Sequence, residues 1–204
     1  MARILSVANQ KGGVGKTTTS VNLAASLAFS GKRTLLVDVD PQANASGGLG
    51  VRQGGADAST DHTTYQLITG ETDAAAAARP TAVEHLFVIA STRDLAGAEV
   101  ELVGAERREF RLREALTPAR SSYDFIVLDC PPSLGLLTIN ALVAADAVVI
   151  PLQCEYYALE GLSQLLQTIK TVKRGFNQRL EVQGILLTMY DARNNLSRQV
   201  ADEV

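Results

Sequence analysis

The segment with the clearest chemical meaning lies near the N-terminus and reads QKGGVGKTT at positions 10–18. Its glycines let backbone N–H groups turn inward around phosphate oxygens, and a helix that follows points its positive end at the same anion. Lys16 is placed to bridge the β and γ phosphates of a nucleotide, and Thr17 to offer a hydroxyl to Mg²⁺. The predicted nucleotide-binding residues are Lys11, Gly12, Gly13, Val14, Gly15, Lys16, Thr17 and Thr18. A glycine-rich turn that binds nothing is disfavoured, because GKT stands between an expected strand and an expected helix.

Two aspartates follow an apolar run in the sequence LLVDVDPQ at positions 35–42. Ligands of open α/β sheets bind at the carboxyl ends of the strands, where both side chains are expected. Asp40 precedes a proline and leaves the strand, so we predict that it orients an attacking water. Asp38 is predicted to support the Mg²⁺ shell or Lys16. A capping or turn carboxylate is the alternative for Asp38, because aspartate is common in turns.

A third aspartate, Asp129, ends the apolar run at 125–128. A hydrophobic strand that ends in aspartate is the Walker B arrangement, in which the carboxylate holds Mg²⁺ directly or through water. Cys130 is expected to be a small buried residue at the strand end. Pro131 and Pro132 make the next loop stiff. Together with the phosphate loop, this pattern predicts a metal-assisted phosphate site.

These side chains need a scaffold, and the hydrophobic pattern predicts one. Short apolar runs at 4–8, 34–39, 86–90, 125–128, 147–150 and 182–187 indicate buried strands. Helices are predicted at 17–30 and at 157–174, the second with one apolar face and a stop at Gly175. Strands that alternate with helices form parallel βαβ units. We therefore predict an α/β fold with a mostly parallel twisted sheet and helices on both faces.

Composition limits the remaining choices. A chain of 204 residues with 46% hydrophobic residues suits one globular domain. The net charge of −3 excludes a generally basic surface, so contact with DNA has to come from a local patch. Cys130 and Cys154 form no CxxC pair, and we expect neither a structural disulfide nor a zinc-type site. No run of eighteen apolar residues occurs and the N-terminus enters a strand pattern at once, which predicts a soluble cytoplasmic protein, and we expect no membrane partner.

Three further segments carry weaker expectations. The glycine-rich stretch 47–60 is predicted to form a mobile surface loop. The alanine run 74–78 suits an ordinary helical turn. The last residues, 194–204, are predicted to begin a helix that stops without a clear cap.

The phosphate loop also carries a resemblance. The generic Walker A pattern has glycine where this chain has Gln10, whereas KGGVGKTT at 11–18 resembles the deviant Walker A class of P-loop ATPases, in particular the ParA/Soj partitioning family. Further matches are DVDPQ at 38–42, LAGAE at 95–99, DCPPSLG at 129–135 and PLQCEYYALEG at 151–161. The resemblance covers nearly the whole of residues 1–204 as a single ATPase domain, which we expect to lack the C-terminal segment that the family normally has.

The resemblance implies a weak ATP hydrolase that uses ATP and Mg²⁺, with Lys11, Lys16 and Asp40 as catalytic residues and Thr17, Asp129 and Asp38 as the metal site. Members form a nucleotide-sandwich homodimer in which the extra lysine, here Lys11, reaches the partner's phosphates. They coat DNA nonspecifically, and a centromere-binding ParB protein stimulates hydrolysis and releases them. A nucleoid-associated location in the cytoplasm follows, on either a chromosome or a plasmid. The loop that Pro131 and Pro132 make stiff is then expected to sense the γ phosphate.

Some alternatives stay open. Arg193 falls where the family has a DNA-binding basic residue, although a solvated arginine is as good an interpretation. A membrane-cycling ATPase resembling MinD shares Lys11 but requires an amphipathic membrane helix. A relative of the nitrogenase iron protein would need cysteines in other contexts than those of Cys130 and Cys154. An inactive nucleotide-binding protein is disfavoured by the complete set of site residues.

Overall fold

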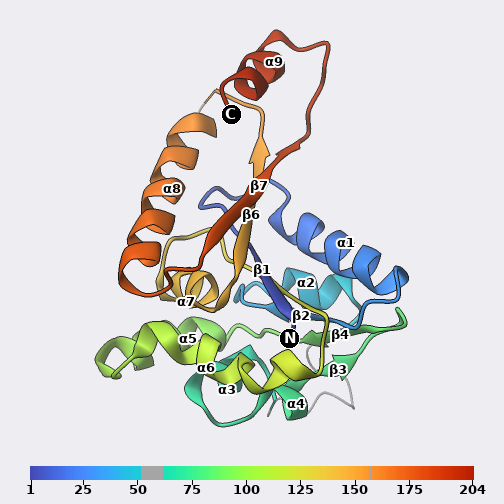
Figure 1. The fold of residues 1–204 in the computed structure, drawn as a ribbon, viewed down its shortest axis with the longest axis vertical. Coiled ribbons are helices and arrows are strands. Elements are labelled where there is room, and N and C mark those ends of the chain that lie inside the picture. The colour runs from blue at the N-terminus through green and yellow to red at the C-terminus, as the bar shows by residue number, and fades with distance from the viewer. Residues whose placement is uncertain (52–61, 157) are drawn as a thin grey trace.

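One mixed sheet forms the centre of the molecule (Figure 1). The computed structural model describes residues 1–51, 62–156 and 158–204. Within these ranges the sheet has seven strands in the order β3-β4-β2-β5-β1-β6-β7. The strands are β1 (Arg3–Val7), β2 (Thr34–Asp38), β3 (Arg79–Pro80), β4 (Leu86–Ile89), β5 (Phe125–Asp129), β6 (Ala147–Gln153) and β7 (Glu181–Thr188). All pairings are parallel except that of β3 with β4, which confirms the predicted mostly parallel sheet.

Helices cover both faces of the sheet, as predicted (Figure 1). The first face carries α1 (Lys16–Phe29) and α2 (Asn44–Gly48). The second face carries α3 (Thr64–Thr69), α4 (Ala74–Ala77), α5 (Leu95–Glu101), α6 (Arg111–Leu116), α7 (Leu136–Ala144) and α8 (Ala158–Gly175). Short 3₁₀ turns lie at Leu102–Gly104, Arg108–Phe110 and Pro118–Ser121, and α9 (Asn195–Asp202) lies beyond β7.

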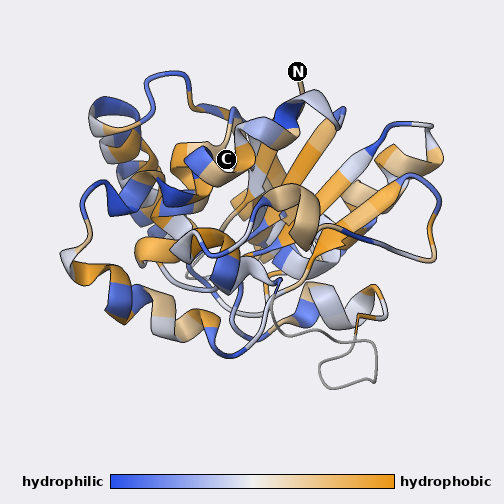
Figure 2. Cartoon of the chain, turned by 90° about the horizontal axis from the view of Figure 1, so that it is seen from below, coloured by the Kyte–Doolittle hydropathy of each residue, from blue (hydrophilic) through white to orange (hydrophobic). Residues whose placement is uncertain are grey.

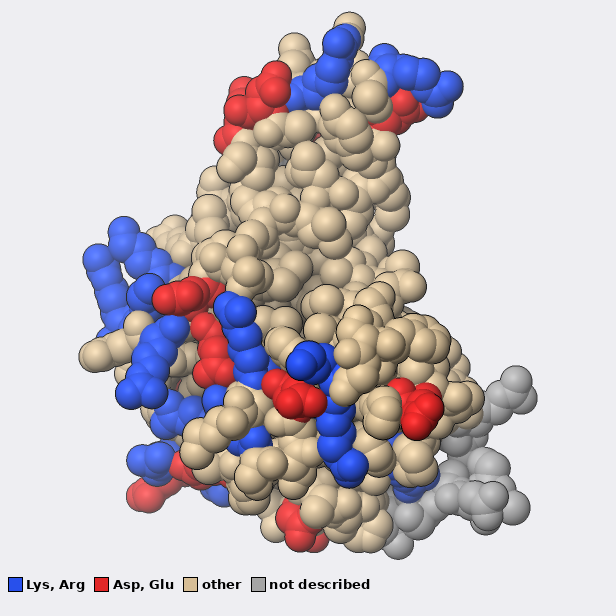
Figure 3. All heavy atoms as spheres, turned by 45° about the vertical axis from the view of Figure 1, so that its right-hand side comes forward, with Lys and Arg blue, Asp and Glu red and all other residues tan. Residues whose placement is uncertain are grey.

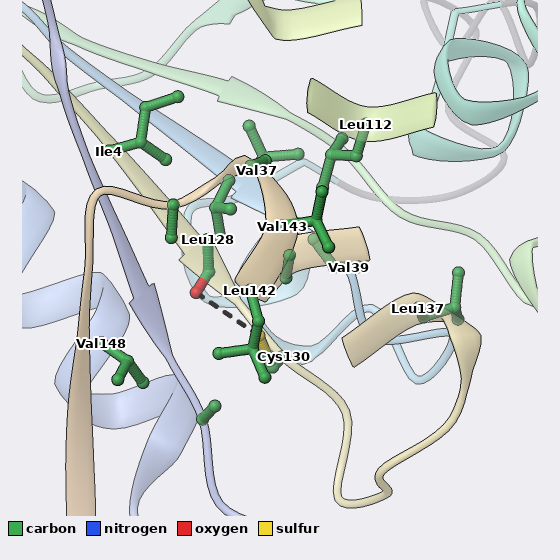
Figure 4. Close-up of a cluster of buried hydrophobic side chains, with 14 of the residues drawn as sticks. Ile4, Val37, Val39, Leu112, Leu128, Cys130, Leu137, Leu142, Val143 and Val148 are labelled. Atoms are coloured by element: carbon green, nitrogen blue, oxygen red, sulfur yellow. Dashed lines mark hydrogen bonds between the residues drawn. The ribbon is translucent and has the colours of Figure 1, made fainter. Parts of the chain in front are cut away.

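The central strands are apolar at successive positions because both of their faces are buried. In β2, Leu36 packs towards α1, whereas its neighbours Leu35 and Val37 belong to the core under α5, α6 and α7. Figure 2 shows these apolar strands at the centre, and Figure 4 shows the larger core, with Leu128 and Cys130 among its members. This burial on two faces holds the carboxyl ends of β1, β2 and β5 side by side.

Most predicted elements are confirmed, with shifts of one or two residues at their ends, and β6 is longer than predicted. The run 182–187 does form a strand, but the prediction that it is buried was wrong. Val182 and Leu186 retain 43% and 44% of their exposure, because β7 is the edge of the sheet. The helical turn in the alanine run and the final helix are both present, and Asn194 caps the latter through Leu196 N–H.

The prediction of a mobile surface loop at 47–60 is wrong at its start, and most of the segment lies outside the described residues. Gly47 and Gly48 end the short helix α2, so the loop cannot begin there. Gly50 has a φ of +79°, a conformation that glycine adopts readily. Residues 52–61 lie outside the described part of the chain. In the described ranges, no helix is both long and apolar enough to cross a membrane.

Candidate nucleotide-binding site

The phosphate loop joins the end of β1 to the start of α1, at the carboxyl edge of the sheet. Gly13 and Gly15 have φ values of +75° and +84°, in the left-handed region that a side chain would strain. Gly15 is also the N-cap of α1, and no side chain caps the helix there. The first amides of α1 are therefore available to an anion at the positive end of the helix.

Lys16 is turned back into the loop. Its ammonium donates a hydrogen bond of 2.8 Å to the carbonyl oxygen of Lys11, and the residue is only 6% exposed. Burial lowers the pKa of Lys16, while Cys130, Asp129 and Asp40 raise it. The lysine thus spans the mouth of the loop, where the phosphates of a nucleotide would meet its charge.

Asp129 lies at the end of β5 and carries an unsatisfied oxygen. Its Oδ1 accepts a 2.7 Å hydrogen bond from Ser20 Oγ, but Oδ2 is buried without a hydrogen-bond partner. Burial raises the pKa of Asp129 to about 7, against the opposing effects of the Ser20 hydrogen bond and of the nearby Thr17 hydroxyl. A buried carboxylate oxygen beside a threonine hydroxyl fits a cation.

The donor set also fits Mg²⁺ in particular. Among the described residues, no three His, Cys, Asp or Glu side chains converge as a complete metal cage. Mg²⁺ is commonly held by one or two carboxylates together with phosphate oxygens and water, and does not need such a cage. Asp129 and Thr17 are the residues that would hold the ion.

Asp38 pairs in register with Asp129 on the adjacent strand, but its carboxylate faces other groups. One oxygen accepts from the backbone N–H and the hydroxyl of Ser46, at 2.8 and 2.7 Å, and the other from Asp40 N–H at 3.2 Å. Burial raises its pKa to about 6, although the Ser46 bonds act to lower it. This geometry favours the turn-carboxylate alternative, and a role for Asp38 at the metal stays a prediction.

Asp40 leaves β2 and reaches an open cleft of about 460 Å³, a size suited to a small ligand. Its Oδ1 accepts a 2.9 Å hydrogen bond from Gln42 N–H. The cleft is lined by Gly12, Gly13, Gly15, Lys16, Thr17, Thr18, Asp40, Gln42, Asn44, Pro132 and Met189. The fold therefore brings Asp40 and the phosphate loop to the same cleft.

Lys11 behaves differently from the other loop lysine. Its ammonium forms an ion pair with Glu155, and its side chain keeps 40% of its exposure. Gln10 beside it donates hydrogen bonds to Gly161 O and to Gln164, at the start of α8. The loop thus presents Lys16 inward and holds Lys11 against the segment between β6 and α8.

Arg193 lies away from the cleft, in the connection between β7 and α9. Its side chain is 90% exposed and forms a bidentate pair with Asp191, at 2.8 and 3.0 Å. The arginine lowers the pKa of Asp191. Basic and acidic side chains are intermixed on the face that Figure 3 shows. The structure therefore does not bring Arg193 together with the other predicted site residues.

Sequence reasoning missed several groups that support the site. Ser20 lies one helical turn after Lys16 and Thr17, so helical periodicity could have identified it. Ser46, which holds Asp38, had no comparable signal. Glu155 belongs to a recognised motif but was given no role. The 2.9 Å bond from Thr188 Oγ1 to Val14 O joins residues 174 positions apart, beyond the reach of local patterns.

A phosphate loop between the first strand and helix, beside a buried carboxylate at the end of a neighbouring strand, defines the P-loop nucleoside triphosphatase class. Residues 2–182 match the AAA domain family. The chromosome partitioning protein ParA of Myxococcus xanthus is 57% identical over 100% of this chain and 71% of its own length. The sporulation initiation inhibitor protein Soj of Bacillus subtilis is 56% identical over 100% of this chain and 79% of its own. The chain belongs to the ParA/Soj family of chromosome-partitioning ATPases.

Solved structures agree with this placement. The cobyrinic acid a,c-diamide synthase of Mycobacterium smegmatis, with a bound ATP analogue and magnesium, superposes with a TM-score of 0.92 at 41% identity. The match covers 100% of this chain and 82% of that one. A plasmid partition protein from Borrelia burgdorferi has a TM-score of 0.88 at 26% identity, over 99% and 84% of the two chains. The predicted P-loop fold of the deviant Walker A type is thereby confirmed.

Proposed function

We propose that residues 1–204 act as one ATPase domain that binds ATP and Mg²⁺, forms a sandwich homodimer, and binds DNA nonspecifically until hydrolysis resets it. The observation that carries the proposal is that two lysines of the same loop lie in different positions. Lys16 closes the chain's own phosphate loop, whereas Lys11 is held outside it by a half-buried ion pair. A lysine in that position is available to the phosphates of a second subunit.

Within one subunit, each site residue then has a defined role. The amides from Gly12 to Thr18 cradle the phosphates, and Lys16 neutralises their charge. Thr17 and Asp129 would hold Mg²⁺, which when bound offsets negative charge on the phosphates. Asp40 lies at the cleft and orients the attacking water. Lys11 from the other subunit stabilises charge on the transferring phosphoryl group.

The proposed partners are DNA and a ParB-like centromere-binding protein that stimulates hydrolysis. The two named relatives are a chromosome partitioning protein ParA and a Soj protein. This similarity supports a role in segregation over a MinD-like membrane cycle. An ATP-bound dimer on DNA would be associated with the nucleoid. Arg193 is the proposed DNA contact. To bind DNA, its guanidinium would have to leave its ion pair with Asp191 and pair with a DNA phosphate.

The test is light scattering coupled to size-exclusion chromatography, with ADP and with ATP–Mg²⁺. Asp40→Ala should bind ATP but hydrolyse it slowly, and should therefore accumulate as a dimer with ATP and stay monomeric with ADP. Adding Lys11→Ala to this protein should reduce the dimer, whereas the matched control Lys32→Ala, in an exposed lysine after α1, should not. A monomer under both conditions, or an Asp40→Ala protein with the parental hydrolysis rate, would overturn the proposal.

A further inference from the structure

The loop of residues 130–135 connects the metal-site strand to α7 and lines the nucleotide cleft. It begins directly after Asp129, and Pro132 forms part of the cleft wall. A Cβ placed on Gly12 of the phosphate loop would lie 4.0 Å from Pro132 Cβ, so the two loops are close neighbours. At the other end, Thr138 Oγ1 of α7 donates a 2.7 Å hydrogen bond to Ser133 O. The position of α7 therefore sets the position of this loop.

The N-terminus of α7 is held from another helix. Gly135 is its N-cap and supplies no side-chain hydrogen bond, and the first turn contains no acidic residue. Glu99 of α5 fills that place, since its Oε1 accepts from Leu137 N–H at 3.4 Å. A carboxylate at the positive end of a helix is favourable, and it satisfies an amide that the helix leaves free.

Gly135 is matched to this carboxylate. A Cβ on Gly135 would collide with Glu99 Oε1, the flexible end of that side chain, so any larger residue here would push the carboxylate out of its present position. The backbone of Gly135 is extended, with φ −75° and ψ −173°, which other residues also adopt. Alanine at this position would therefore displace the carboxylate without straining the backbone. The LAGAE motif at 95–99 thus supplies a contact to the DCPPSLG motif at 129–135.

We infer that Glu99 is a positioning residue that fixes the 130–135 loop in the geometry required to distinguish ATP from ADP. The inference rests on the proposed function, because it assumes that this cleft holds the γ phosphate. Glu99 contacts α7 and not the phosphate loop at 10–18, whose amides would cradle the α and β phosphates that ADP shares with ATP. Its loss should therefore weaken binding of a γ phosphate and leave ADP binding intact.

The experiment compares Glu99→Ala, Gly135→Ala and Glu99→Gln with the parent. Fluorescent ADP and a non-hydrolysable ATP analogue are titrated with Mg²⁺, and kcat and KM for ATP are measured. Glu101→Ala is the matched control, because Glu101 lies on the same helix but accepts hydrogen bonds from Tyr65 and not from α7. Thermal unfolding of each variant shows whether the fold persists.

Glu99→Ala and Gly135→Ala should each weaken the analogue and lower kcat by about tenfold, the factor that corresponds to a lost helix cap. ADP affinity should stay within a factor of about two. Glu99→Gln keeps an acceptor oxygen and should recover much of the loss. Equal losses for ADP and the analogue, or parental values for all variants, would overturn the role of Glu99 alone. A parent that neither hydrolyses ATP nor binds the two nucleotides differently would overturn the proposed function and this inference with it.

Discussion

Replacing Asp129 with asparagine tests how strongly burial disfavours the charge at the metal-site carboxyl. Asp129 is fully buried, and its pKa rises from 3.8 to about 7, first through burial and then through Asp38 and Asp40 nearby. The folded protein therefore binds this proton more tightly than the unfolded chain does. About three pKa units at 1.36 kcal/mol each give about 4 kcal/mol. This stability is present below pH 4 and is lost as the pH rises through about 7.

Urea unfolding of the nucleotide-free protein without Mg²⁺ measures this effect, at pH values between about 4.5 and 8. The free energy of unfolding of the parent should fall as the pH rises. Asp129→Asn retains an oxygen for the Ser20 hydrogen bond but has no charge to lose, so its free energy of unfolding should fall by about 3 kcal/mol less over this range, because part of the effect is already lost at pH 4.5. Asp38, whose pKa is about 6, is present in both proteins, so the comparison removes its own titration and leaves only its repulsion with Asp129 in the difference.

The slope with pH is the decisive quantity, because the amide group adds a cost that does not vary with pH. Parallel curves for the parent and Asp129→Asn across this range would refute the protonation of a buried carboxyl. Adding ATP and Mg²⁺ to the parent should reduce the slope, since a cation at Oδ2 favours the ionised form. Asp129→Asn is the control for this measurement, because ATP and Mg²⁺ should not change the pH slope of a protein that lacks the carboxyl group.

Four other outcomes are expected. Lys16→Ala should weaken ATP binding by about tenfold to a hundredfold through loss of a charge-assisted contact, as measured by fluorescence titration; an unchanged affinity would contradict its position in the loop. Glu155→Gln should release Lys11 and raise the ATP-dependent dimerisation constant by up to about fivefold, because a partly exposed ion pair contributes up to about 1 kcal/mol; a dimer fraction below the parental value in light scattering would contradict this prediction. Leu128→Ala should reduce the free energy of unfolding by about 2–5 kcal/mol, since Leu128 is fully buried, and a loss below that range in urea would mean that the core collapses around it. Arg193→Ala should reduce DNA affinity and lower the salt slope by about one, and an unaltered slope in binding titrations would exclude it as a phosphate contact.

The fold was predictable because the sequence pattern of the strands also shows that both of their faces are buried. Runs such as 34–39 and 125–128 are apolar at successive positions, a pattern that arises when both faces of a parallel sheet are covered. The exception is β7, whose residues are equally apolar although Val182 is 43% exposed. An apolar side chain can lie either in the core or at the surface, and its exposure depends on whether its strand lies at the edge of the sheet.

The site was predictable where a motif is continuous and less so where tertiary contacts decide. The glycines of the phosphate loop were identifiable because left-handed backbone requires them. Asp38 and Asp129 have the same local context, an apolar strand that ends in aspartate. Ser46 donates two hydrogen bonds to Asp38, whereas Oδ2 of Asp129 has no hydrogen-bond partner. That difference depends on where α2 begins, which no pattern in the strand could reveal.

The phosphate loop is braced by three hydrogen bonds, and the residues at their other ends lie late in the chain. Asn9 donates to Pro151 O at 2.7 Å, Gln10 to Gly161 O, and Val14 accepts from Thr188, across separations of 142 to 174 residues. During synthesis the loop leaves the ribosome first, while its braces are still untranslated. A nascent chain that ends before residue 188 would hold the glycines and Lys16 but lack one of these braces. The phosphate loop therefore gains this contact only once β7 has been synthesised and has joined the sheet.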